Sequence, residues 1–256
     1  MSSRDRRAFF AACSVAFLLA ASAARGDEVM AAVATNFLNV VSQLESEFEA
    51  QTGHDLRLVA GSTGKLYAQI VNGAPFEVFL AADQERPARL IAEGLALADS
   101  RWSYAEGRLA LWSAKPGFVD ADGARTLRSA EFRRLAIANP DLAPYGLAAR
   151  EVVAKLGLER QLSGRIVLGE NIGQTLALIA TGNAEVGFIA LSQLGSLSAS
   201  SIGSHWIVPR SLHSPIRQDA VLLAQAANRP GARAFLDYLR TPAVKDRIRS
   251  HGYDVN

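Results

Sequence analysis

The chain has 256 residues, of which 49% are hydrophobic and 20% are charged, and its formal net charge at pH 7 is +2. A chain of this length can form one large domain or two modest ones. The nearly balanced charge gives no basic field, which argues against a protein that binds nucleic acid.

The first 26 residues predict an export signal. Arginines within 4–7 precede an apolar stretch at 8–21, and small residues follow at 21–24. Cleavage is therefore expected at about residue 23 to 26. The apolar stretch is too short to cross a membrane, which takes about 20 residues. The paired arginines fit the twin-arginine export route as well as the general secretory route, and the sequence leaves that choice open.

The mature chain is expected to lack cysteine, because the only one, Cys13, lies within the predicted signal. That excludes disulfides, a thiolate nucleophile and cysteine metal sites from the mature protein. The histidines show no metal-ligand spacing; they are His54, His205, His213 and His251. We expect no cofactor.

The first part of the mature chain predicts alternating strands and helices. A strand at 29–34 precedes a helix at 37–53, in which apolar residues recur at helical spacing. An apolar run at 56–60 leads through a small polar loop into a second helix. A strand at 76–81 then precedes a helix from about 84 to 94, where Asp83 is expected to cap the first turn.

The second part continues the same alternation. Further strands are expected at 108–112, 134–138, 186–190, 206–208 and 220–224. Helices are expected at 146–156 and 173–181, each followed by glycine, and as a C-terminal pair that starts at Pro230 and breaks near 241–242. This order predicts an α/β fold with mainly parallel sheets. Asp219, which precedes the last strand, is expected to make a hydrogen bond near a hinge.

Four strand-to-helix junctions are suited to bind an anion. The first N–H groups of a helix have no partner inside it, and the helix dipole leaves that end partly positive. In α/β sheets such ends meet at the carboxyl ends of the strands. The junctions are Thr35-Asn36, Ser62-Thr63-Gly64, Pro144-Tyr145-Gly146 and Asn171-Ile172-Gly173. Aimed at one point, they would form a cage of neutral donors.

The second junction resembles the end of a nucleotide-binding P-loop at Gly64-Lys65, but the pattern fails twice. Its opening glycine would fall at Val59, and Leu66 stands where the metal-binding hydroxyl is needed. An ATP site is therefore rejected. The plainer alternative is a glycine-rich loop that only starts a helix.

Five stretches together resemble the periplasmic molybdate-binding proteins that serve ABC importers. They are AVATNFLNVV at 32–41, AGSTGKLYAQIVNGAPFEVFLAAD at 60–83, ANPDLAPYGLAAREVVAKLG at 138–157, GENIGQTLALIATGNAEVGFIALS at 169–192 and AFLDYLRTPAVKDRIRSHGY at 234–253. The resemblance implies a type II periplasmic binding protein fold, with two lobes and a ligand cleft between them. Crossovers would lie near 104–108 and 210–217. The implied divisions are a signal at 1–26, one lobe from 27–106 and 213–256, and the other from 107–212.

By this resemblance, an oxyanion is held by hydrogen bonds and not by direct bonds to its metal. The implied ligand residues are Thr35, Asn36, Ser62 and Thr63 on one lobe, and Tyr145, Asn171 and Ile172 on the other. Ile172 would act through its backbone amide. The chain departs from the family at three positions. It has Ala190 where many members have tyrosine, and it has Glu77 and Ala81 where many members have aspartate and serine. The phenol of Tyr145 is expected to replace the missing one.

The chemistry of the junctions favours the same ligands. Molybdate and tungstate are fully deprotonated dianions at neutral pH, so their site should contain only donors. Phosphate keeps a proton and would need an acceptor, but no junction has Asp or Glu at its tip, although Glu170 is adjacent to one. Whether Lys65 or Glu170 approaches the ligand stays open. Sulfate passes this filter and would have to be rejected by cavity size.

The sequence therefore predicts a monomeric periplasmic receptor that captures molybdate or tungstate and delivers it to an ABC permease. A receptor for sulfate or another tetrahedral oxyanion is the first alternative. The second is an exported hydrolase with Ser62 as nucleophile. That enzyme usually needs a G-x-S-x-G turn, whereas this chain has A-G-S-T-G.

Overall fold

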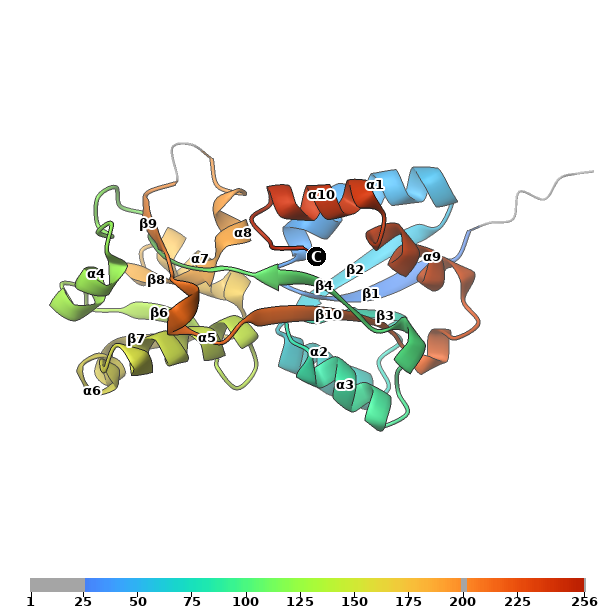
Figure 1. Ribbon diagram of the computed structural model, residues 1–256, viewed down its shortest axis with the longest axis horizontal. Helices are drawn as coiled ribbons and strands as arrows, with labels where there is room; N and C mark the ends of the chain where they lie inside the picture. Colours follow the sequence, from blue (N-terminus) through green and yellow to red (C-terminus); the bar gives the residue numbers. More distant parts are fainter. Residues whose placement is uncertain (1–25, 199–201, 256) are drawn as a thin grey trace, which may run out of the picture.

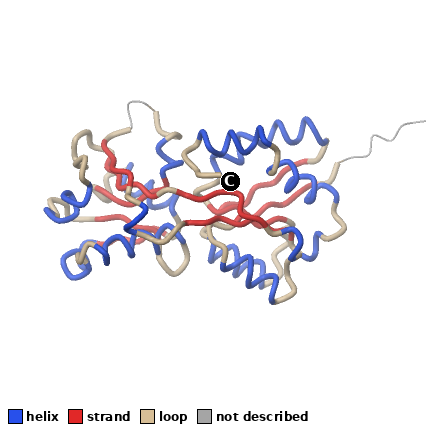
Figure 2. Tube along the Cα trace, in the orientation of Figure 1, coloured by secondary structure: helices blue, strands red, loops and turns tan. Residues whose placement is uncertain are grey.

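A computed structural model describes residues 26–198 and 202–255, so the predicted signal lies outside the described residues except for its last position. The elements form two lobes, each a five-stranded sheet flanked by helices (Figure 1). Figure 2 shows strands in the middle of each lobe and helices around them. The predicted two-lobe α/β fold is confirmed.

The first lobe takes the beginning and the end of the described chain. Its first part contains β1 (Glu28–Ala34), α1 (Leu38–Thr52), β2 (Asp55–Gly61), α2 (Thr63–Val71), β3 (Val78–Leu80), α3 (Glu85–Ala92), a 3-10 turn (Ala98–Ser100) and β4 (Trp102–Gly107). Its second part contains β10 (Ile216–Leu222), a 3-10 turn (Ala224–Ala226), α9 (Pro230–Leu239) and α10 (Pro242–Ser250). The strand order is β2-β1-β3-β10-β4.

The second lobe is built from the intervening segment. It contains β5 (Leu109–Ser113), α4 (Gly123–Ser129), β6 (Leu135–Ala138), α5 (Pro144–Lys155), α6 (Glu159–Leu162), a 3-10 turn (Ser163–Arg165), β7 (Ile166–Gly169), α7 (Ile172–Ala180), β8 (Val186–Ala190), α8 (Leu191–Leu194), β9 (Ser204–Ile207) and a 3-10 turn (Arg210–Leu212). The strand order is β7-β6-β8-β5-β9.

Each sheet is mixed, which corrects the expectation of mainly parallel sheets. β1 runs parallel to β2 and β3, and β6 runs parallel to β7 and β8. In contrast, β10 is antiparallel to β3 and β4, and β5 is antiparallel to β8 and β9. The reason is the passage between lobes. β10 and β5 each enter their sheet from the other lobe. The parallel strands of each sheet end toward the other lobe, so β10 and β5 run in the opposite direction.

The two passages lie side by side. β4 leads from the first lobe directly into β5, and β10 returns beside β4 (Figure 1). We call β4 and β10 the crossing strands. Because the strands parallel to β1 and β6 end toward the other lobe, the junctions that follow them face each other across the gap.

Helix α1 shows how the sequence pattern becomes packing. The apolar residues that predicted it are all buried; they are Phe37, Val40, Val41, Leu44 and Phe48. Burying each such side chain contributes about 1.5–3 kcal/mol. The helix ends at Gly53, whose φ of 73° is the left-handed conformation that glycine tolerates.

Each lobe has its own hydrophobic core between sheet and helices. In the first lobe Phe48 packs edge-on against Phe235, with ring centroids 5.2 Å apart. In the second lobe Leu135 and Phe188 of the sheet share a core with Val152 of α5. Within the described ranges, no helix is long and apolar enough to span a bilayer.

Candidate anion-binding site

The structure brings all seven predicted ligand residues to one small cavity between the lobes. Only about 10 Å³ of the cavity is open to the centre of a water-sized sphere, so little free space separates the lobes here. Its lining is Ala34, Thr35, Asn36, Gly61, Ser62, Thr63 and Ala82 from the first lobe, and Ala143, Pro144, Tyr145, Asn171 and Ile172 from the second. The lobes are therefore closed on each other.

Ser62 is placed at the cavity by the start of α2. It is the N-cap residue, and its Oγ accepts a 3.4 Å hydrogen bond from the N–H of Lys65. A hydroxyl that accepts this bond keeps its own proton for another acceptor. Thr63 follows, and its Oγ1 accepts from the N–H of Ala82 at 3.1 Å.

Thr35 lies at the end of β1, next to the end of β2. Its Oγ1 donates to the carbonyl of Gly61 at 3.0 Å, and its N–H donates to the same oxygen at 3.1 Å. The hydroxyl must therefore turn away from Gly61 before it can donate to a ligand.

On the second lobe, Asn171 and Ile172 begin α7. Asn171 is the N-cap residue, and its Oδ1 accepts from the N–H of Gln174 at 3.0 Å. Ile172 is the first helical residue, so its N–H has no partner inside the helix. A backbone donor at the start of a helix suits an anion.

Tyr145 supplies a phenol from the first turn of α5. The residue is 2% exposed, and its Oη accepts a 3.2 Å hydrogen bond from Nε2 of Gln218. Burial, followed by the neighbouring phenol of Tyr253, raises the pKa of Tyr145 well above its ordinary value. The hydroxyl therefore stays protonated and can act as a donor.

The side chain of Asn36 lies beneath the cavity and is already paired. Its Nδ2 donates to Oε1 of Gln218 at 2.8 Å and to Oη of Tyr253 at 3.0 Å. Both amide hydrogens are then used. What Asn36 can still offer to a ligand is its backbone N–H.

None of the described residues that line the cavity carries a charge. Lys65 and Glu170, whose roles the sequence left open, pair with each other across the lobes at 2.6 Å. Their side chains are 47% and 46% exposed, and neither lines the cavity. Two hydrogen bonds also join the lobes at this rim, from Gly64 N–H to Leu142 O and from Arg86 Nη2 to Asp141 O.

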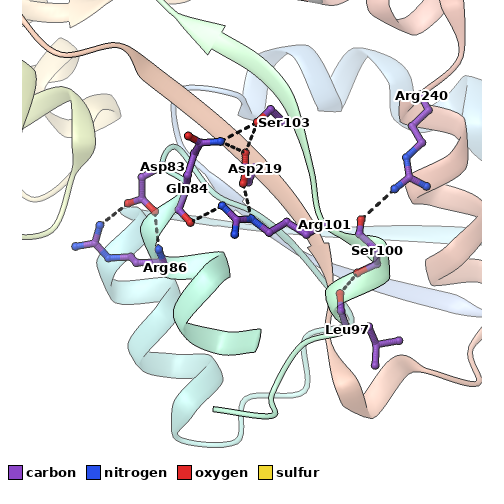
Figure 3. Close-up of polar contacts among 9 residues, drawn as sticks. All are labelled: Asp83, Gln84, Arg86, Leu97, Ser100, Arg101, Ser103, Asp219 and Arg240. Carbon is purple, nitrogen blue, oxygen red and sulfur yellow. Dashed lines mark hydrogen bonds and ion pairs between the residues drawn. The ribbon is translucent and has the colours of Figure 1, made fainter. Parts of the chain in front are cut away.

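Two carboxylates of the first lobe, Asp83 and Asp219, are each paired with an arginine (Figure 3). Asp83 pairs with the guanidinium of Arg86 and accepts from its N–H, so it satisfies a free amide of the first turn as predicted. The helix starts one residue later than predicted, and the N-cap position is Gln84. Burial raises the pKa of Asp83. Asp219 accepts from Arg101 Nε and from Ser103 Oγ, both at 2.6 Å. Ser103 lies on β4, so the hydrogen bond predicted for Asp219 joins the crossing strands.

Sequence reasoning missed the polar network under the cavity. Its members are Tyr104, Ser192, Gln218 and Tyr253, which together with Asn36 and Tyr145 link the two lobes. Gln218 stands between Arg217 and Asp219, and charged neighbours are typical of an exposed segment. Tyr253 lies in a matching stretch, which was the one available signal.

Ser62 lacks the surroundings of a nucleophile. The described lining of the cavity includes no histidine, lysine or carboxylate that could act as a base. The hydrolase alternative therefore has no chemical support.

A two-lobe fold that closes on a buried cavity of neutral donors defines an extracytoplasmic solute-binding protein. The chain belongs to the bacterial extracellular solute-binding protein family, whose model matches residues 29–254. It is 49% identical to the molybdate-binding protein ModA of Azotobacter vinelandii, over 93% of this chain and 94% of that protein. It is 45% identical to the ModA of Rhodobacter capsulatus, over 96% of each chain.

The fold agrees with a solved relative. The structure of the Azotobacter vinelandii periplasmic molybdate-binding protein matches with a TM-score of 0.85 and 42% identity, over 90% of this chain and 100% of that one. These relatives are named as binding proteins and not as enzymes, in agreement with the sequence prediction.

Proposed function

We propose that this protein captures molybdate or tungstate in the interlobe cavity and delivers it to an ABC transporter. The observation that carries the proposal is the lining, which is buried, neutral and rich in donors on both lobes. The relatives named for molybdate binding support the same ligand class.

We assign the donors residue by residue. The hydroxyls of Thr35, Ser62 and Tyr145 donate from side chains, and Asn36 and Ile172 donate from the backbone. Thr63 and Asn171 complete the lining at the two helix starts. The oxyanion is held by hydrogen bonds, and its metal takes no direct ligand from the protein.

The strength of such a site is sufficient without a cation. A hydrogen bond to a charged acceptor contributes about 1.5–3 kcal/mol. Five such bonds sum to about 7.5–15 kcal/mol, a range that includes the roughly 8 kcal/mol of a micromolar complex and at its upper end leaves several kcal/mol for closing the lobes. Hydrogen phosphate would leave its own O–H without an acceptor, at a cost of about 1–3 kcal/mol.

The proposed working cycle follows from the two lobes. Residues 27–106 with 213–256 form one closing body and 107–212 the other, connected by the crossing strands. Ligand binding holds the bodies together, a known mode of domain closure. We assign residues 1–26 to a cleaved signal, place the mature monomer in the periplasm, and take an inner-membrane permease as its partner.

A thermal-shift panel tests the proposal. Mature protein is melted with molybdate, tungstate, sulfate and phosphate at equal ionic strength. Molybdate or tungstate at a hundredfold excess over a micromolar Kd should stabilise the fold by about 2.7 kcal/mol. Stabilisation by sulfate alone would instead establish a sulfate receptor, and no shift with any of the four would reject an oxyanion receptor.

A further inference from the structure

Gln218 is a fully buried polar residue at the base of the cavity. It lies on the crossing strand β10, and its exposed fraction is 0%. Its Nε2 donates to Tyr145 Oη at 3.2 Å, and its Oε1 accepts from Asn36 Nδ2 at 2.8 Å and from Tyr104 Oη at 3.0 Å. It therefore touches a proposed donor on each lobe.

The contacts of Tyr253 with Asn36 determine which atoms donate and which accept in these hydrogen bonds. The carbonyl oxygen of Asn36 can only accept, and the hydroxyl of Tyr253 lies 2.7 Å from it. The other acceptor beside this hydroxyl is Ser192 Oγ at 3.0 Å, and with its proton used on either of these two oxygens, Tyr253 Oη accepts from the Nδ2 of Asn36 at 3.0 Å. This orients the Asn36 amide so that Nδ2 also faces Gln218.

The orientation of the Asn36 amide in turn determines how Gln218 contacts Tyr145. Because Asn36 donates, Gln218 must present Oε1 to it, and the other end of its amide, Nε2, faces Tyr145. The Tyr145 oxygen accepts that bond, so the phenol keeps its own proton as a donor. A ligand oxygen without hydrogen can receive it.

The backbone around Gln218 is shaped for this contact. The register of β10 with β4 shifts between Gln218 and Asp219, and such bulges redirect side chains. The carboxylate of Asp219, the next residue, accepts hydrogen bonds from Arg101 and Ser103 (Figure 3).

Gly107 provides the space for the contact. A Cβ at this position would lie 2.0 Å from Tyr145 Oη and 2.7 Å from Gln218 Nε2. Glycine on the crossing strand therefore lets the phenol of the second lobe approach the amide of β10.

We propose that Gln218 is a positioning residue that points the Tyr145 hydroxyl at the anion as a donor. This rests on the proposed function and deepens it, because it makes the site selective for ligands that only accept. A protonated oxyanion meets a phenol whose oxygen is already occupied by Gln218.

A double-mutant cycle tests this role. Wild type, Tyr145→Phe, Gln218→Met and the double variant are titrated with molybdate by calorimetry. Each single change should weaken binding about tenfold to a hundredfold. If Gln218 acts through the phenol, the double variant should bind within about twofold of Tyr145→Phe. Losses that multiply would overturn the positioning role.

Two further variants keep the test decisive. Gln218→Glu keeps the shape of the side chain but presents an acceptor to Tyr145, so this variant should bind molybdate as weakly as Tyr145→Phe or more weakly. If Gln218→Met fails to fold, Gln218→Glu takes its place in the cycle. Gln161→Met is the control, because Gln161 donates to the carbonyl of Arg128 on the surface of the second lobe, away from the cavity and the crossing strands. Its affinity should equal that of wild type.

The outcomes also separate this inference from the proposed function. Wild type that does not bind molybdate would reject the function itself. Wild type that binds, with multiplicative losses in the cycle, would reject only the role of Gln218. A relative gain of hydrogen phosphate binding in Gln218→Glu would support it further, since the carboxylate restores an acceptor near the phenol.

Discussion

The cavity and its rim both join the two lobes, but they do so with different chemistry. In the cavity the contacts are neutral and buried, as at Ser62 and Tyr145. At the rim the ion pair of Lys65 and Glu170 is about half exposed. Exposed pairs are worth about 0–1 kcal/mol, whereas a hydrogen bond to a buried charge is worth about 1.5–3 kcal/mol. Affinity should therefore reside in the cavity, and the rim should only bias closure.

The largest effect is expected from blocking closure at the cavity. A Cβ at Gly173 would lie 2.6 Å from Cγ2 of Thr35 on the other lobe. Gly173→Val should therefore weaken molybdate binding on the order of a hundredfold or more, because overpacking opposes the closed state. Calorimetric titration measures the loss.

Gly164→Ala is the control for that variant, since a Cβ at Gly164 meets nothing within 4 Å. It should bind like wild type. Equal affinity of Gly173→Val and wild type would show that the closed arrangement is not the one that holds the ligand.

The next effect concerns a single donor. Tyr145→Phe keeps the ring and removes the O–H, so molybdate affinity should fall about tenfold to a hundredfold. Tyr67→Phe is a matched control, because that phenol bonds to Glu93 on the surface of the first lobe. If both variants bind equally well, Tyr145 is a packing residue and the backbone amides carry the second lobe.

A smaller effect is expected at the rim. Lys65→Gln should weaken binding less than about fivefold, and the difference should shrink as salt is raised. Glu28→Gln removes a somewhat more exposed pair with Arg57 inside the first lobe and should leave affinity unchanged. A loss at Lys65 as large as that at Tyr145 would contradict the contrast between rim and cavity.

The smallest effect is expected from pH. Burial raises the pKa of Tyr253 to about 12 and that of Tyr145 well above its ordinary value. A phenol whose folded pKa is raised contributes stability below its unfolded pKa of about 10, which is lost as pH rises toward the folded pKa. Affinity should change less than about twofold across neutral pH, and stability should fall only above about pH 10. Titrations and melting curves over this range check both.

The sequence was most informative where a local rule fixes the structure. Ser62 and Asn171 precede helices and cap them as such residues do, and Gly53 ends α1. Together with the order of strands and helices, these rules located the loops that line the cavity. The division into lobes came from the resemblance and not from a local rule.

The pairing of the crossing strands and the polar network under the cavity could not be predicted, because both depend on contacts between distant parts of the chain. β4 was missed because WSYAEG mixes polar residues and glycine into a strand that crosses between lobes. Its partner β10 comes from more than a hundred residues later, so the antiparallel pairing could not be seen locally. For the same reason nothing in the sequence indicated the hydrogen bond between Gln218 and the side chain of Asn36.

The most direct test of the central claim is the position of the bound metal. Crystals of the mature protein grown with tungstate are measured above and below a tungsten absorption edge, and an anomalous difference map is calculated. One dominant peak is expected between the lobes, at a position from which the oxygens of the anion can accept hydrogen bonds from Ser62, Tyr145 and the amide of Ile172. A dominant peak outside this cavity, or none at saturating tungstate, would contradict it.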